Sequence, residues 1–106
     1  MSAQATPLVM VPLAQQAAQV LKVPLSGTVM QIALRQRSTG LYAEFWQNDT
    51  RCLAGILCQD RTWLIRSKAL GIAGDFCFID TQGTQDPTHT GLGSRYLLLY
   101  RAGWPA

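Results

Sequence analysis

Short turn sequences interrupt this chain at intervals of roughly 8–12 residues, a spacing typical of small all-β domains. Ser26-Gly27, Ser38-Thr39-Gly40 and Asn48-Asp49-Thr50 favour tight turns, because glycine, asparagine and aspartate tolerate positive φ angles. The segments between these turns are rich in β-branched, aromatic and leucine residues. The sequence therefore predicts an all-β fold with no helix longer than about two turns.

Alternation of side-chain character marks the strongest predicted strand, Val29 to Arg37. Within it, Met30, Ile32 and Leu34 alternate with more polar neighbours, the period-two pattern of a strand with one buried face. A second β-rich run, Val20 to Pro24, precedes it, and the turn between the two runs predicts a β-hairpin.

Further apolar runs extend this pattern along the chain. We expect additional strands at Leu8–Leu13, Leu41–Gln47, Cys52–Cys58, Thr62–Arg66, Asp75–Ile79 and Arg95–Arg101. These runs predict about seven short antiparallel strands with one long loop, arranged as a small single-domain barrel or sandwich. A chain of 106 residues has room for one domain, which we assign to residues 19–106. Residues 1–18 are expected to be an extended or loosely ordered N-terminal extension.

Charged residues are scarce, at 14% of the chain against the usual quarter or so, while 48% is hydrophobic. This composition argues against disorder and indicates that a partner covers part of the folded surface. The formal net charge is +3, but no basic run is present, so specific nucleic-acid binding is not expected. The first 21 residues carry no ionisable side chain, and no apolar stretch reaches the roughly 18 residues of a membrane span. We therefore expect neither a secretory signal nor a membrane anchor.

The cysteine pattern indicates a reducing, intracellular place of synthesis. The chain has three cysteines, so at least one of them cannot form a disulfide within the chain. Their spacing, at Cys52, Cys58 and Cys77, matches no zinc motif. His89 is the one histidine, and no motif places it with Ser94 or a cysteine as a nucleophile and base. The sequence therefore predicts neither an enzyme nor a bound cofactor.

Two features could be mistaken for ligand sites. Asp75, Asp80 and Asp86 form the main acidic cluster, but their spacing does not match a calcium loop, so we interpret them as turn and cap residues rather than metal ligands. Gly91-Leu92-Gly93-Ser94 looks superficially like a phosphate loop, but a predicted strand follows it where such loops lead into a helix.

The long loop from Asp80 to Ser94 is the strongest candidate functional segment. It spans fifteen residues with almost no apolar side chain, and loops of that length in small domains are functional or disordered. The Arg95 guanidinium forms a planar fork that matches one carboxylate, so we expect it to pair with Asp75, Asp80 or Asp86 and to fold the loop back onto the domain. In this interpretation Gly83, Gly91 and Gly93 adopt backbone angles that other residues avoid. The alternative is that Arg95 points outward to a neighbouring protein.

Three motifs carry a resemblance to a known family. They are R-S-T-G-L-Y at Arg37–Tyr42, A-G-I-L-C at Ala54–Cys58, and G-x-x-G-D-x-x-F-x-D-T-Q-G-x-x-D-P-x-x-x-G-L-G-S-R-Y at Gly71–Tyr96. Together they resemble the small baseplate plug proteins of contractile-tailed bacteriophages, and the most specific part is Asp80 to Arg95. Residues 1–18 depart from the family pattern.

The resemblance implies a structural virion protein that is not an enzyme. Such a protein is made in the host cytoplasm and lies in the tail baseplate, at the tail axis among hub, spike and tube-initiator proteins, where it closes the tube lumen before ejection. Three-fold hub and spike geometry suggests three copies. In this setting Asp75, Asp80, Asp86, Gly91, Gly93 and Arg95 are expected to serve as a loop scaffold or an interface.

An oligonucleotide-binding β-barrel is the alternative function. Aromatic side chains on a sheet can stack nucleobases when basic residues lie between them. The candidates for such a surface are Tyr42, Trp46, Trp63, Tyr96, Tyr100 and Trp104, with Arg66, Arg95 and Arg101.

Overall fold

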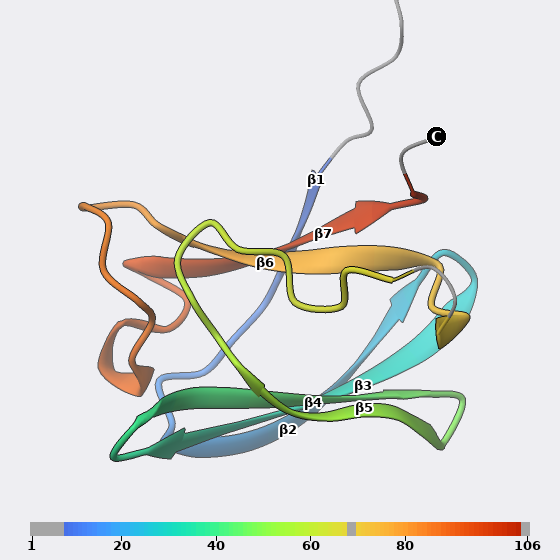
Figure 1. Cartoon of the computed structure of the whole chain (residues 1–106), viewed down its shortest axis with the longest axis horizontal. Helices are drawn as coiled ribbons and strands as arrows, with labels where there is room; N and C mark the ends of the chain where they lie inside the picture. Colours follow the sequence, from blue (N-terminus) through green and yellow to red (C-terminus); the bar gives the residue numbers. More distant parts are fainter. Residues whose placement is uncertain (1–7, 68–69, 105–106) are drawn as a thin grey trace, which may run out of the picture.

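The chain folds into two antiparallel β-sheets that face each other as a sandwich (Figure 1). The computed structural model describes residues 8–67 and 70–104. One sheet has the strand order β1-β7-β6 and the other has the order β2-β3-β4-β5. The strands are β1 (Leu8–Val11), β2 (Ala18–Leu25), β3 (Thr28–Arg37), β4 (Gly40–Gln47), β5 (Thr50–Leu57), β6 (Gly74–Asp80) and β7 (Tyr96–Ala102). The predicted all-β class is confirmed, and of the two expected architectures the structure adopts the sandwich.

Local turn chemistry sets the register of the four-stranded sheet. Ser26 and Gly27 both have positive φ angles, 53° and 74°, as the two-residue turn between β2 and β3 requires. Asn48 and Asp49 form the equivalent turn between β4 and β5, with φ angles of 48° and 69°. The hairpin predicted at Ser26-Gly27 and the turn predicted at Asn48-Asp49 are therefore confirmed.

Aromatic rings join the two sheets across the core. The ring centroid of Phe76 in β6 lies 4.9 Å from that of Phe45 in β4 and 4.9 Å from that of Tyr100 in β7. The Tyr100 hydroxyl also lies 2.8 Å from the Ser26 hydroxyl at the β2–β3 turn. The inward-facing side chains of β3 and β4 complete a core that is almost fully buried: Met30, Ile32 and Leu34 of β3, and Leu41 and Ala43 of β4. This packing holds the two sheets together and so fixes the strand ends from which the loops extend.

The predicted strand at Thr62–Arg66 is wrong. Within it, only Trp63 forms a bridge, to Cys77 of β6. Arg66 adopts a left-handed backbone with a φ angle of 62°, and its N–H and that of Ile65 bind the Asp75 carboxylate instead of a neighbouring strand. The Asp75 side chain thus accepts the hydrogen bonds that a neighbouring strand would accept in a regular β-sheet.

The segment predicted as an N-terminal extension contains β1, which pairs with β7 along the edge of the three-stranded sheet. Its last residue, Val11, is buried in the core. Residues 1–7 lie outside the described part of the chain. In the described part, no helix is long and apolar enough to cross a membrane.

Candidate functional site

The long loop between β6 and β7 is fastened at its base by one buried carboxylate. Asp80 ends β6, and its side chain is fully buried. Arg95 donates from Nε to Oδ1 and from Nη2 to Oδ2, both at 2.9 Å, which is a bidentate fork. The backbone N–H groups of Gln82 and Gln85 each donate to the same carboxylate at 2.9 Å. Of the three carboxylates expected as partners of Arg95, the structure selects Asp80.

This ion pair changes the proton affinity of both groups. The hydrogen bonds from Arg95 hold the pKa of the Asp80 carboxyl well below its ordinary value, and the pKa of Arg95 is raised in turn. The Arg95 carbonyl accepts hydrogen bonds from the Thr81 N–H and hydroxyl, both at 2.8 Å. The guanidinium carbon lies 5.1 Å from the centroid of the Tyr96 ring. Arg95 therefore points into the base of its own loop.

A second arginine, which the sequence reasoning missed, fastens the first residues of the loop. Arg61 forms an ion pair with its neighbour Asp60 and donates to the carbonyl oxygens of Gly83 and Asp80, at 3.1 and 3.3 Å. The Asp60 carboxylate accepts the Asp80 N–H at 2.7 Å, and the Asp86 carboxylate accepts the Asp60 N–H at 3.0 Å. Apart from the adjacent Asp60–Arg61 pair, these partners are about twenty residues or more apart, so no local sequence pattern could have indicated them.

Asp75 does not join the other two carboxylates. Its oxygens accept the N–H groups of Ile65, Arg66 and Phe76 at 2.7–2.8 Å, so it fastens the 60–66 segment to β6. The predicted acidic residues thus bind three different parts of the backbone. Among the described residues, no group of three or more metal-ligating side chains comes together.

The predicted glycines have different roles from those expected. Of the three glycines predicted to have unusual backbone angles, only Gly93 has a positive φ angle, 81°. A Cβ at this position would lie 2.7 Å from the Leu13 carbonyl oxygen. The left-handed backbone expected at Gly83 and Gly91 is wrong. Gly91 is needed for close packing instead, because a Cβ there would lie 2.7 Å from the Tyr96 ring.

The residues considered for catalysis are not assembled. The Ser94 hydroxyl donates to the Gly91 carbonyl, and His89 Nδ1 has no hydrogen-bond partner among the described residues. Cys77 is buried, and burial, followed by the nearby Asp60 and Asp75 charges, raises the pKa of its thiol. A thiol with a raised pKa is a poor nucleophile.

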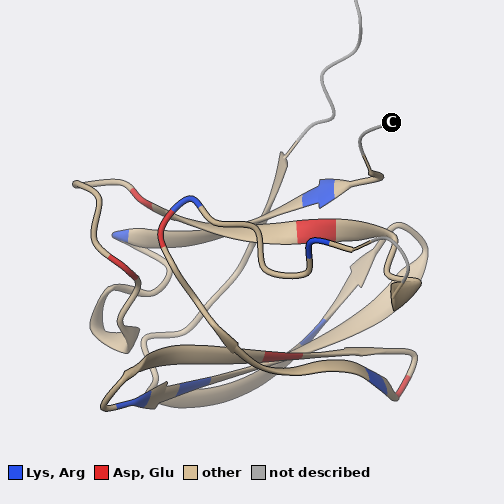
Figure 2. Ribbon diagram, in the orientation of Figure 1, with Lys and Arg blue, Asp and Glu red and all other residues tan. Residues whose placement is uncertain are grey.

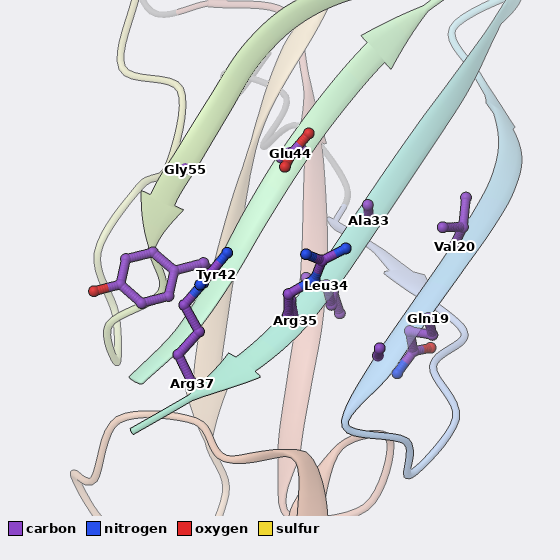
Figure 3. A pocket seen from close by; sticks show the side chains of 10 residues that line it. Gln19, Val20, Ala33, Leu34, Arg35, Arg37, Tyr42, Glu44 and Gly55 are labelled. Atoms are coloured by element: carbon purple, nitrogen blue, oxygen red, sulfur yellow. The ribbon is translucent and has the colours of Figure 1, made fainter. Parts of the chain in front are cut away.

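Basic residues are spread over both sheets rather than gathered along one track (Figure 2). The outer face of the four-stranded sheet carries a hollow of about 270 Å³. Arg35 and Arg37 of β3 lie there beside Tyr42 and Glu44 of β4 (Figure 3). A glutamate within this small basic group reduces its attraction for phosphates, so the described surface gives the oligonucleotide-binding alternative little support.

The geometry alone does not identify a function, but a comparison with known protein families identifies the family. Residues 9–103 match the family described as cyanophage baseplate Pam3 plug gp18. The chain belongs to this family. The match covers nearly the whole chain, including most of β1 and the loop between β6 and β7, and it confirms the resemblance to baseplate plug proteins. It also extends into residues 9–18, which were expected to depart from the family pattern. No curated protein matches the chain.

Family membership makes this a structural protein of a phage tail baseplate. A baseplate plug associates with other baseplate components, so the chain is expected to lie against neighbours in the virion. Strand β1 offers one apolar contact surface for such a neighbour. Leu8, Val9 and Met10 are 52%, 45% and 59% exposed, and β1 is an edge strand whose outer side pairs with no other described strand.

Proposed function

We propose that this protein closes the tube lumen of a contractile tail, as a plug on the tail axis among the hub, spike and tube-initiator proteins. The match of residues 9–103 to a plug family carries the proposal. A protein with this role is held by contacts on several sides, which agrees with a chain in which only 14% of residues are charged. Three copies would satisfy the three-fold symmetry of a hub and spike, and synthesis would take place in the host cytoplasm.

The loop between β6 and β7 is held in one conformation, which suits a plug that must keep its shape until ejection. The base of the loop is fixed by Asp80 and Arg95, and its first residues are held by Arg61. The exposed residues between these points, Thr84 and Gln85 among them, are mostly polar and uncharged. A loop that is ordered before binding loses little conformational entropy when a neighbour docks against it. We therefore assign Asp80, Arg95 and Gly91 to a scaffold, and the exposed loop residues to an interface.

The edge strand β1 supplies the second proposed contact. Unpaired strand edges readily accept a strand from another protein, and natural proteins usually protect them with charge or proline. Here the exposed side chains of Leu8, Val9 and Met10 are all apolar. A neighbouring baseplate protein that covers them would remove this apolar surface from water.

Complementation of a phage that lacks this chain tests the proposed function. Tails assembled without the protein should show an open lumen at the baseplate end of the tube, and supplying the wild-type protein should close it. A lumen that is equally closed in tails without the protein would show that another component is the plug.

A further inference from the structure

A second hollow, of about 430 Å³, lies on the outer face of the three-stranded sheet. In β7, Tyr96, Leu98 and Tyr100 face the core, so Arg101 points to the outer face. Trp63, which bridges to β6, and Trp104, which follows β7, line the hollow with Arg101. Neither the loop scaffold nor the apolar edge of β1 includes these residues.

Arg101 is poised to donate hydrogen bonds but has no acceptor among the described residues. Its guanidinium carbon lies 4.1 Å from the centroid of the Trp63 ring, so one flat face of the group is stacked on the indole. Stacking leaves the N–H edges of the guanidinium free. Its Nε is buried and has no hydrogen-bond partner among the described residues. A buried charged donor without an acceptor is unfavourable, which indicates that a bound partner supplies one.

The surroundings of Arg101 are built to hold an acceptor nearby. Arg66 donates from Nε to the Trp63 carbonyl at 2.7 Å, which fixes this second guanidinium beside the same tryptophan. Trp104 donates its indole N–H to the Ile72 carbonyl at 2.8 Å, so its polar atom is already satisfied. The guanidinium groups of Arg66 and Arg101 therefore lie in the hollow with two indole rings.

The charges that line the hollow favour an anion. Three arginines and one aspartate line it. The donors of Arg61 are engaged by Asp60 and the loop carbonyls. Asp75, the cross-strand neighbour of Arg101, already accepts three backbone N–H groups. The arginines at 66 and 101 are left to bind an external acceptor. We infer that this hollow receives a carboxylate side chain from an acidic segment of a neighbouring baseplate protein.

A protein carboxylate fits this site better than nucleic acid does. A guanidinium edge matches a carboxylate with two parallel hydrogen bonds, and arginine and tryptophan are enriched at the centres of protein interfaces. Binding to a nucleic-acid backbone draws on several phosphates along a basic track. The described surface has no such track, since its basic residues are dispersed over both sheets (Figure 2). The inference rests on the association of the plug with other baseplate proteins and does not depend on closure of the lumen.

Titration of the intact protein with short capped peptides tests the inference. The probes are acetyl-tetraglutamate amide, the matched tetraglutamine peptide and a short oligothymidylate. Two-dimensional NMR would follow the indole N–H of Trp63 and the Nε–H of Arg101. We expect the glutamate peptide to shift both signals and to bind at least about tenfold more tightly than the glutamine peptide, the factor that one charge-assisted hydrogen bond supports.

Two substitutions make the result specific to the site. Arg101→Gln and the exposed Arg66→Gln should each weaken binding of the glutamate peptide at least about fivefold, as expected for losing part of a charged hydrogen-bond set. Arg51→Gln makes the same charge change on an exposed position of β5 in the other sheet and should leave binding unchanged.

Three results would overturn the inference. They are equal binding of the glutamate and glutamine peptides, equal loss of binding in the Arg51 control, and binding of the oligothymidylate alone. Since the lumen is tested separately by complementation, failure here would leave the proposed plug function standing.

Discussion

Replacing Asp75 with asparagine should destabilise the protein by detaching the 60–66 segment from β6. The Asp75 side chain is almost fully buried, and its Oδ1 accepts the N–H groups of Ile65 and Phe76 while Oδ2 accepts that of Arg66. Asparagine has the same shape but only one acceptor oxygen. If that oxygen keeps the two contacts of Oδ1, the new NH₂ group faces the Arg66 N–H, donor against donor.

The magnitude follows from these three contacts. Losing one hydrogen bond to a charged acceptor costs about 1.5–3 kcal/mol, and the other two weaken because their acceptor becomes neutral. We therefore expect Asp75→Asn to lower the free energy of unfolding by about 3 kcal/mol. For a domain of this size that corresponds to a fall in Tm of roughly 10–20 °C.

Thermal and urea unfolding, followed by circular dichroism, measures this difference. Asp86→Asn is the matched control, because that carboxylate is exposed and accepts a single backbone N–H, from Asp60. It should cost less than about 1 kcal/mol. An Asp75→Asn protein as stable as the Asp86→Asn control would refute the assignment of Asp75 as the residue that fastens this segment.

Three further predictions concern the loop and the cysteines. Arg95→Lys keeps the charge but loses the guanidinium fork, so it should lower the Tm, and Arg95→Ala should lower the Tm further. If both variants keep the wild-type Tm yet fail to enter particles, Arg95 belongs to an interface instead. Arg95 holds the pKa of Asp80 below its ordinary 3.8, so the stabilisation that Asp80 supplies is full above about pH 4 and is lost as the pH falls further. Acid unfolding should therefore show a loss of stability below about pH 4 that is smaller in Asp80→Asn than in the wild type. Burial raises the pKa of Cys58 to about 12, so mass spectrometry after alkylation at mildly alkaline pH should find Cys52 labelled first, and faster labelling of Cys58 would contradict its burial.

Contacts between neighbours in sequence were predictable. The turns at Ser26-Gly27 and Asn48-Asp49 follow from the positive φ angles that these residues tolerate, and the alternation in β3 follows from burial of one sheet face. The pairing of Arg95 with a nearby carboxylate followed from the chemistry of the guanidinium fork, although three acceptors were equally open at that point.

Contacts between distant segments were not predictable. A strand was expected at Thr62–Arg66 because its composition is strand-like, but Asp75 takes up the N–H groups of its last residues. The stacking of Arg101 on Trp63 joins residues 38 positions apart and has no signature in either local sequence. Such contacts depend on which segments the whole fold brings side by side.

The location of the chain in the virion is the central claim that remains to be measured. Cryo-electron microscopy of purified particles, with this structure fitted into the tail tip, would measure it directly. The plug function predicts density for the sandwich on the tail axis at the baseplate end of the tube lumen, with a neighbouring protein against the apolar edge of β1. Density for the chain only at the periphery of the baseplate, with the lumen filled by another protein, would contradict it.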